Sequence, residues 1–242
     1  MRRRRVDYAV ILAAGMGTRL AAVNANRPKA LFPVRGRTLF DYACDFAEAV
    51  AEQRIVVGGF GYEQLEQFVG DSRRSRLQLV AASDYRHGNI VSLLAAVPLL
   101  DGATLIMNVD HVYADEVRTL VAAPRDQITI FCDGQRALTD DDMKVAVDAR
   151  GSVRSISKQL DRYDTGYVGL TYVPRSQMTR YRSAVMQTFA TKGKQAAAES
   201  VIQTLADDGV LIPVCELDGL KWAEVDTPID AEELSRRSDL WR

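Results

Sequence analysis

Cysteine and histidine are scarce in this sequence. Its 242 residues include only three cysteines, Cys44, Cys132 and Cys215, which are far apart. They form no CxxC pair, lack zinc-ligand spacing and give no disulfide framework, so a reducing cytosol is the expected compartment. The two histidines are His87 and His111, and neither is accompanied by the nucleophile-elbow motif that a Ser-His-Asp hydrolase would need. A structural role is favoured for both, although His111 could support a neighbouring metal ligand.

Long apolar runs and an excess of one charge are also lacking. The longest apolar stretch, residues 91–100, is about half of a membrane span and contains Pro98. No apolar segment of signal-peptide length follows the arginines at positions 2–5, which are interpreted as a solvated chain end. With 31 Lys and Arg against 32 Asp and Glu, a broadly basic surface for nucleic acid is excluded. We expect a cytoplasmic protein with no membrane span and no nucleic-acid partner.

The first half alternates short apolar runs with amphipathic segments, which is typical of βα units on a mainly parallel sheet. Strands are expected at residues 8–13, 54–58, 77–81, 104–109 and 127–132. Helices are expected at residues 39–53, 63–69, 90–99 and 115–122.

The second half is less regular. Residues 143–147 and 153–158 flank Arg150-Gly151 and predict a hairpin. Further strands are expected at 164–173 and 210–216, and helices at 176–189, 196–207 and 228–238. The fold class predicted is α/β, with a Rossmann-like mixed, mainly parallel sheet flanked by helices and a small antiparallel extension in the second half. Because no linker interrupts the chain, a single domain over residues 1–242 is expected.

A glycine-containing segment, Leu12-Ala-Ala-Gly15-Met-Gly17-Thr18-Arg19-Leu20, follows the first strand. Ligands on open α/β sheets gather at the carboxyl ends of strands, and successive backbone amides there can bind phosphate. Arg19 adds a planar cation suited to phosphate oxygens. Leu20 replaces the third glycine of the dinucleotide fingerprint, so NAD binding is disfavoured. A tight turn alone would also explain the two glycines.

Lys29 follows Pro28, which constrains the local path of the backbone. A lysine there could neutralise charge on a transferring phosphoryl group. A surface lysine is the alternative, but two cations flanking one glycine loop favour the functional interpretation.

Three carboxylates are candidates for the site, and the first of them suits a hard cation such as Mg²⁺. Asp110 stands at the carboxyl end of the strand expected at 104–109. Glu224 and Asp226 share one face if they lie in a strand, because side chains alternate there. Asp226 could instead cap the last helix, since Thr227-Pro228 resembles a helix start.

The signature at 12–20, followed by Pro28-Lys29-Ala-Leu31, resembles the sugar-phosphate nucleotidyltransferase superfamily, which has a Rossmann-like nucleotide-diphospho-sugar transferase fold. Five later segments are most similar to CTP:inositol-1-phosphate cytidylyltransferases: 110–113, 144–147, 157–160, 164–166 and 222–227. Residues 88–93 and the final Glu-Val-Asp also resemble phosphocholine cytidylyltransferases.

The resemblance implies residue roles. Arg19 and Lys29 would be catalytic and grip the phosphates, while Asp110 and Asp226 would hold Mg²⁺. The implied nucleotide-binding residues are Leu12, Ala13, Ala14, Gly15, Gly17, Thr18, Ser83, Gly88, Asn89, Ser92 and Asp110. The implied acceptor-binding residues are His111, Tyr113, Lys144, Thr165, Gly166 and Glu224. Residues 1–132 would form the nucleotide-binding half and residues 133–242 the acceptor-binding half.

The implied reaction transfers CMP from CTP to a small phosphorylated alcohol, inositol 1-phosphate or a phosphocholine-like compound, and releases pyrophosphate. An aminoalkyl phosphonate acceptor, or another nucleoside triphosphate with a sugar 1-phosphate, stays open. Tyr113, Tyr163, Tyr167 and Trp222 could box a quaternary ammonium, although core packing more often explains such residues.

Two alternative functions are also considered for this sequence. A glycosyltransferase would typically show Asp-x-Asp where this chain has Asn108-Val-Asp110. A catalytically silent nucleotide-binding domain is disfavoured because all the charged candidates are present. A homodimer is compatible with the sequence.

Overall fold

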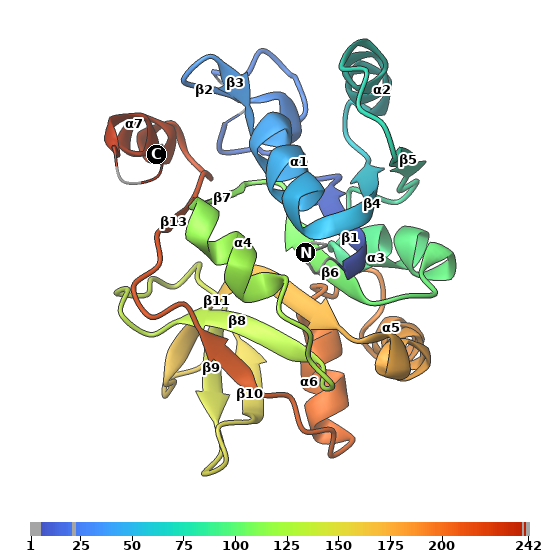
Figure 1. Cartoon of the computed structure of the whole chain (residues 1–242), viewed down its shortest axis with the longest axis vertical. Helices are drawn as coiled ribbons and strands as arrows, with labels where there is room; N and C mark the ends of the chain where they lie inside the picture. The colour runs from blue at the N-terminus through green and yellow to red at the C-terminus, as the bar shows by residue number, and fades with distance from the viewer. Residues whose placement is uncertain (1–5, 21–22, 239, 241–242) are drawn as a thin grey trace.

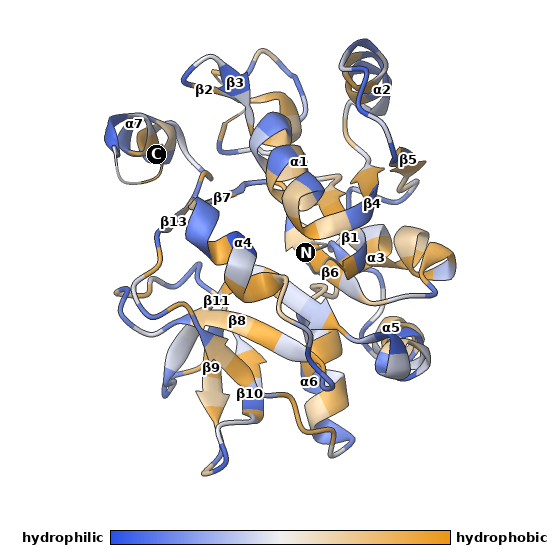
Figure 2. Ribbon diagram, viewed as in Figure 1, coloured by the Kyte–Doolittle hydropathy of each residue, from blue (hydrophilic) through white to orange (hydrophobic). Residues whose placement is uncertain are grey.

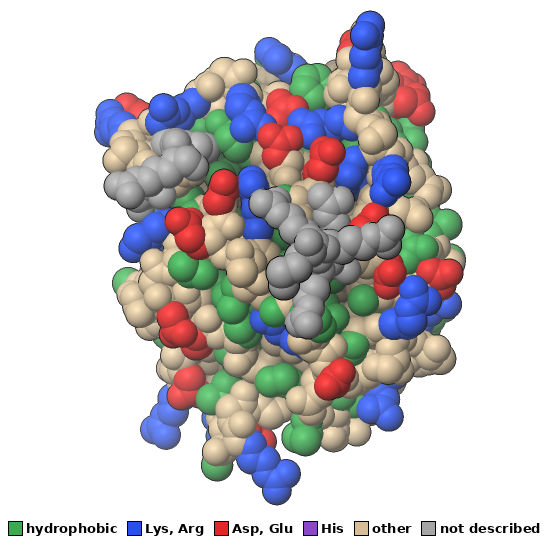
Figure 3. All heavy atoms as spheres, in the orientation of Figure 1, with side chains coloured by type: hydrophobic (Ala, Val, Ile, Leu, Met, Phe, Trp, Pro, Cys, Tyr) green, Lys and Arg blue, Asp and Glu red, His purple; other side chains and the backbone are tan. Residues whose placement is uncertain are grey.

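The computed structural model describes residues 6–20, 23–238 and 240 (Figure 1). The arginine run at positions 2–5 lies outside the described residues. None of the helices in this described part has the length and apolar character that crossing a lipid bilayer requires. On the face shown in Figure 3, basic and acidic side chains are intermingled, in keeping with the balanced composition.

A nine-stranded mixed sheet organises the described chain. Its main path runs β10-β9-β11-β6-β1-β4-β5, and β8 joins β11 to β12. The strands of the first half are β1 (Val6–Ala13), β4 (Ala51–Gly58), β5 (Leu77–Ala81), β6 (Thr104–Asn108) and β8 (Thr129–Asp133). Those of the second half are β9 (Lys144–Val147), β10 (Val153–Ser157), β11 (Thr165–Val173) and β12 (Val214–Glu216).

Strand direction divides the sheet into two regions. β6, β1, β4 and β5 pair in parallel, as does β12 with β8. β11 is antiparallel to β6, β8 and β9, and β9 is antiparallel to β10. The predicted fold class, a mainly parallel sheet with an antiparallel extension in the second half, is therefore confirmed.

Helices cover both faces of the sheet (Figure 1). α1 (Leu39–Val50) and α4 (Asp115–Val121) pack on one face, and α3 (Ile90–Ala96), α5 (Met178–Lys192) and α6 (Ser200–Asp207) on the other. α2 (Tyr62–Asp71) contacts β5, and α7 (Pro228–Arg236) contacts β2. Short 3₁₀ turns occupy Lys29–Leu31, Val97–Leu99 and Arg175–Gln177.

The alternation of side chains along β1 explains why the core has two layers. Val10 and Leu12 belong to the layer under α3, α5 and α6, whereas Ala9 and Ile11 belong to the layer under α1 and α4. A strand buried on both faces must be apolar throughout. Figure 2 accordingly shows the strands of the sheet as mainly hydrophobic.

Several predicted boundaries are wrong because pairing overrides local pattern. The helix expected at 39–53 ends at Val50, since Ala51 already pairs with Val6 as the start of β4. The helix expected from 196 begins at Ser200, because the preceding backbone bonds to the 88–90 segment instead. There the Gly88 N–H donates to the Lys194 carbonyl and the Ile90 N–H to the Ala196 carbonyl.

Two small sheets were not predicted. β2 (Pro33–Val34) pairs with β3 (Arg37–Thr38), and β7 (His111–Tyr113) pairs antiparallel with β13 (Trp222–Glu224). Three-residue strands are too short to show a periodic pattern. The β7–β13 pair matters most, because it joins the chain after β6 to a segment more than a hundred residues later.

Candidate functional site

The candidate site lies where β1 and β6 end. Leu12 and Asn108 are paired in neighbouring strands, and the Val109 N–H donates to the Leu12 carbonyl at 3.2 Å. The glycine loop after β1 therefore begins beside the turn that carries Asp110. Gly15 is exposed, and no heavy atom would lie within 4 Å of a Cβ added there. This loop can approach a ligand closely through its backbone.

Lys29 is buried at the centre of the site. Its side chain is 9% exposed, and its Nζ donates to Asp110 Oδ2 at 2.6 Å and also to Asp226. Pro28 holds extended dihedral angles immediately before the 3₁₀ turn that carries Lys29. The surface-lysine alternative is therefore wrong, because this ammonium joins two carboxylates far apart in sequence.

β7 and β13 bring a third carboxylate to the same place. Their register sets Glu224 opposite His111, and the Val225 N–H donates to the Asp110 carbonyl at 2.9 Å. His111 Nδ1 lies 2.7 Å from Asp110 Oδ1, while Nε2 lies 4.0 Å from Glu224 Oε2. The imidazole thus lies between the two carboxylates.

The His111 ring is fixed from two sides. It stacks on Trp222 with ring centroids 5.5 Å apart and planes 3° from parallel. On β11, Gly169 has a φ of +75°, and a Cβ there would lie 2.8 Å from His111 Nε2. Gly169 stands where the register of β11 against β8 shifts. A bulge without a side chain therefore leaves room for the imidazole.

Asp226 is placed differently from the prediction. β13 ends at Glu224, so the two acids do not share one strand. The predicted helix-capping role belongs to Thr227, which forms a reciprocal capping box with Asp230 ahead of Pro228. The Asp226 N–H also donates to Asp230 Oδ2, at 2.9 Å. Asp226 itself contacts Lys29 and lies 3.4 Å from Arg19 Nη1.

Charge and burial set the protonation of this cluster. Burial alone would lower the pKa of Lys29, but Asp110 and Asp226 outweigh it and raise that pKa well above its usual value. Burial would raise the pKa of Asp110, yet Lys29 and His111 hold it well below its usual range. Burial raises the pKa of Glu224, only partly opposed by His111. The cluster therefore keeps a fixed ammonium beside an ionised aspartate.

The donor set fits a hard divalent cation. Asp110, Glu224 and Asp226 line one cavity of about 300 Å³. Ligand atoms of Asp110, His111 and Glu224 lie within 4.8 Å of one another. The two aspartates already meet at one ammonium, so their oxygens can also converge on a metal ion.

The predicted nucleotide-binding residues are only partly at the cavity. Asn89 and Asp110 line it. Leu12, Ala13 and Ala14 are buried at the end of β1, whereas Thr18 in the loop is exposed. Ser83 is exposed, Gly88 is packed tightly against the Ala196 carbonyl, and Ser92 is buried within α3.

Of the predicted acceptor-binding residues, His111 and Glu224 are among the described residues that line the cavity, and the other four are not. The Tyr113 hydroxyl donates to the Val168 carbonyl, and the Lys144 ammonium to the Lys158 carbonyl. Thr165 is buried, and Leu138 packs against Gly166.

Tyr167, suggested from the sequence as part of an aromatic box, also lines the cavity. Sequence reasoning assigned no role to other residues of the cavity wall, which include Asn108, Asp141, Asp142, Lys158 and Glu199. Asp141 lies 3.1 Å from Arg19 Nη1 and so helps to hold that guanidinium. Asn108 directly precedes the Val109-Asp110 turn, so its place at the strand end could have indicated it. Asp141 and Glu199 lie outside any recognisable motif.

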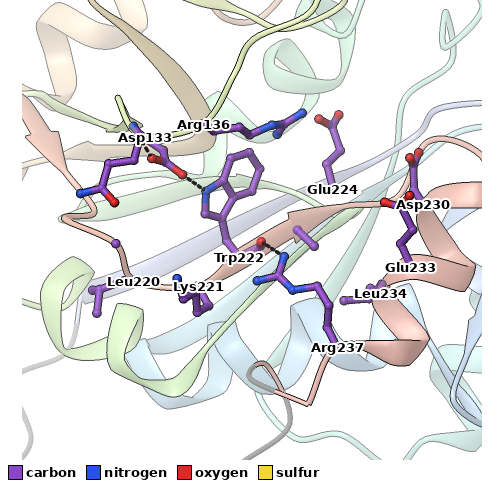
Figure 4. Close-up of a pocket in the computed structure, with 13 residues that line it drawn as sticks. Asp133, Arg136, Leu220, Lys221, Trp222, Glu224, Asp230, Glu233, Leu234 and Arg237 are labelled. Atoms are coloured by element: carbon purple, nitrogen blue, oxygen red, sulfur yellow. Dashed lines mark hydrogen bonds between the residues drawn. The ribbon is translucent and has the colours of Figure 1, made fainter.

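A second cavity, of about 430 Å³, lies between β13 and α7 (Figure 4). Trp222 Nε1 donates to Asp133 Oδ2 at 2.8 Å, and the Arg136 guanidinium lies 5.0 Å from the indole ring. Glu224 borders both cavities. The suggested aromatic box is therefore not assembled, because Trp222 lines this cavity and Tyr167 the other.

This chain is similar to several known proteins. Residues 9–208 match the family model described as the MobA-like NTP transferase domain. The bifunctional IPC transferase and DIPP synthase of Rubrobacter xylanophilus is 31% identical over 229 residues, which are 92% of this chain and 50% of the relative. The chain thus spans half the length of that relative. The 2-aminoethylphosphonate cytidylyltransferase of Lancefieldella rimae is 29% identical over 87% of this chain and 81% of its own.

Two solved structures share the fold. The inositol-1-phosphate CTP transferase from T. maritima superposes with a TM-score of 0.81 at 21% identity, covering 92% of this chain and 90% of its own. The CTP:phosphocholine cytidylyltransferase from Streptococcus pneumoniae gives 0.73 at 20% identity, covering 96% and 98%. At these identities the likeness establishes a common fold.

Proposed function

Because the chain belongs to the family of MobA-like NTP transferases, we propose that it transfers CMP from CTP to a small phosphorylated alcohol and releases pyrophosphate. The acceptor would be inositol 1-phosphate or a phosphocholine-like compound. The observation that carries this proposal is the buried Lys29 ammonium held between Asp110 and Asp226 beside the glycine loop. The relative named as a 2-aminoethylphosphonate cytidylyltransferase supports CTP as the donor.

The charged residues have distinct roles in this proposal. Backbone amides of residues 13–17 would bind the nucleotide phosphates, and Arg19 would face the leaving pyrophosphate. Lys29 would stabilise charge that develops on the α-phosphoryl group. The raised pKa of Lys29 supports this role, since the group stays charged at neutral pH. Mg²⁺ held by Asp110 and Asp226 would neutralise phosphate charge between the two anionic reactants.

The attacking group needs no general base. The second pKa of a phosphate monoester is near ~6, so its oxygen is mostly anionic at neutral pH. His111 is then free to position Asp110, to which its Nδ1 is bonded.

Both proposed halves of the chain contribute residues to the cavity wall. Residues 1–132 contribute Asn89 and Asp110, and residues 133–242 contribute Met143 and Glu224.

The direct test is pyrophosphate release with Mg²⁺ across a grid of substrates. The grid would combine CTP, UTP, GTP and dTTP with inositol 1-phosphate, phosphocholine, 2-aminoethylphosphonate and glucose 1-phosphate. We expect release in the CTP column only. An empty grid from a chain that still binds CTP would overturn the enzyme proposal and favour a silent nucleotide-binding domain.

Gly17 provides a test of how Lys29 is positioned. Gly17 has a φ of +59°, and a Cβ there would lie 2.8 Å from Lys29 Cβ. Gly17→Ala is expected to destabilise the fold by about 1–2 kcal/mol. It should also lower turnover about tenfold or more through misplacement of Lys29. Urea unfolding and steady-state kinetics would measure the two effects.

Gly15→Ala is the matched control, because the space around Gly15 is open and its backbone does not need a glycine. It should preserve stability. If nucleotide phosphates approach Gly15, the KM for CTP rises. Equal stability of the two variants would contradict the close packing of Gly17 on Lys29.

A further inference from the structure

Glu199 differs from the aspartates that line the cavity. Four aspartates there each have a cationic partner: Asp110 and Asp226 pair with Lys29, Asp141 with Arg19, and Asp142 with Arg136. Among the described residues, no Lys or Arg nitrogen lies within 4.0 Å of the Glu199 carboxylate. Among the described residues, Glu224 also lacks a Lys or Arg partner, but it has His111 Nε2 at 4.0 Å, whereas Glu199 has no such contact.

The backbone around Glu199 is firmly placed. The 194–198 segment is bonded to the 88–90 segment, and the Ala198 N–H donates to Asn89 Oδ1 at 2.6 Å. Glu199 follows directly, and both Asn89 and Glu199 line the cavity. The position of this carboxylate is thus set by contacts between elements.

Lys158 and His111 act on Glu199 electrostatically, but neither forms an ion pair with it. Burial raises the pKa of Glu199. Hydrogen bonds from its own backbone and from the Asn89 side chain, together with Lys158 and His111, only partly oppose that rise. Lys158 is exposed and His111 bonds to Asp110. Glu199 is half-buried, and a carboxylate partly removed from water is stabilised when a ligand brings a cation to it.

Glu199 is also separate from the candidate metal ligands. The group whose ligand atoms lie within 4.8 Å of one another comprises Asp110, His111 and Glu224. A metal ion at that cluster would therefore not account for Glu199. Phosphate groups would be repelled by its charge, so a substrate in this cavity would place its phosphates away from Glu199.

Building on the proposed function, we propose that the acceptor carries an ammonium group at the end opposite its phosphate or phosphonate, and that Glu199 binds that group. Tyr167 lines the same cavity, and its aromatic ring could attract the ammonium group by a cation–π interaction. Glu199 is thus a specificity-determining residue that distinguishes cationic from uncharged acceptors. Inositol 1-phosphate and sugar 1-phosphates lack the group it would bind.

Pairs of acceptors that differ only in this charge give the sharpest test. Phosphocholine is compared with 3,3-dimethylbutyl phosphate, phosphoethanolamine with propyl phosphate, and 2-aminoethylphosphonate with propylphosphonate. With CTP and Mg²⁺, wild-type protein should prefer the charged member of at least one pair. In Glu199→Gln, the kcat/KM ratio within that pair should fall by about 30-fold, as expected when one partner of a buried charge pair is lost.

In Glu199→Gln, the preference should be lost because the KM for the charged acceptor rises, while the KM for CTP stays unchanged. Glu116→Gln, at an exposed glutamate of α4, is the matched control and should keep the wild-type ratio. If Glu199→Gln does not fold, Glu199→Asp and the wild-type preference itself still test the proposal. Competitive inhibition of wild-type protein by free choline or ethanolamine against the acceptor is a second expected result.

Two negative results have different meanings. Turnover of inositol 1-phosphate or glucose 1-phosphate with no preference within any pair would overturn the assignment of Glu199 and leave the proposed function standing. Equal ratios in wild-type protein and Glu199→Gln would do the same. No pyrophosphate release with any acceptor would overturn the proposed function, and the assignment of Glu199 with it.

Discussion

Asp110→Asn is expected to lower turnover by about 10³-fold while the chain still folds. The substitution keeps the size of the side chain and removes the charge that faces Lys29 at 2.6 Å. It also removes one of the two carboxylates proposed to hold Mg²⁺. The effect should be in kcat, measured as pyrophosphate release at saturating CTP, acceptor and Mg²⁺. Circular dichroism would confirm that the fold is retained.

Asp226→Asn should act in the same direction, since its carboxylate meets the same ammonium. Asp115→Asn provides the control, because Asp115 is an exposed aspartate in the first turn of α4, close in sequence to Asp110. Its turnover should equal that of wild-type protein. Near-wild-type turnover of Asp110→Asn at saturating Mg²⁺ would contradict the metal assignment.

The parts of the fold that follow local rules could be predicted from the sequence. The apolar runs of β1, β4 and β6 are buried on both faces, and the fold class follows from their alternation with helices. The end of a parallel strand is also where the glycine loop and Asp110 lie. For that reason the sequence could indicate the region of the site before any tertiary contact was known.

The parts that depend on distant contacts could not be predicted. β7 and β13 are three residues each, and only their pairing brings Glu224 opposite His111. The position of Asp226 is set by the capping box of α7 rather than by strand alternation. Glu199 has no motif of its own, and its place depends on the bonding of residues 194–198 to residues 88–90. Contacts between residues that are distant in the sequence produce no periodic pattern from which they could be predicted.

The residues whose roles were implied by the family resemblance also fall into two groups, those that meet at the site and those that pack around it. Lys29, Asp110 and Asp226 do meet, as expected for carboxylates and a cation at one cleft. Tyr113 has its hydroxyl bonded to a backbone carbonyl. Gly166 is covered by Leu138. A motif residue can therefore serve the packing around a site instead of its ligand.

Lys29→Met is expected to impair both stability and the chemical step. The variant keeps a long side chain but leaves Asp110 and Asp226 without the ammonium that lies between them. Removing one partner from such a buried set costs about 3 kcal/mol. Added Mg²⁺ should restore part of the lost stability by binding the two carboxylates, and should raise the unfolding temperature of the variant more than that of wild-type protein.

The kinetic result separates a catalytic role for Lys29 from a structural one. The double variant Lys29→Met/Asp226→Asn relieves the repulsion between the carboxylates, so it should be more stable than Lys29→Met and remain inactive. In Lys29→Met itself, kcat should fall about 10²–10³-fold, with a KM for CTP close to the wild-type value, because its partner charge grows in the transition state. A raised KM with unchanged kcat would instead mean that Lys29 binds CTP equally in the ground and transition states, and would contradict its proposed role.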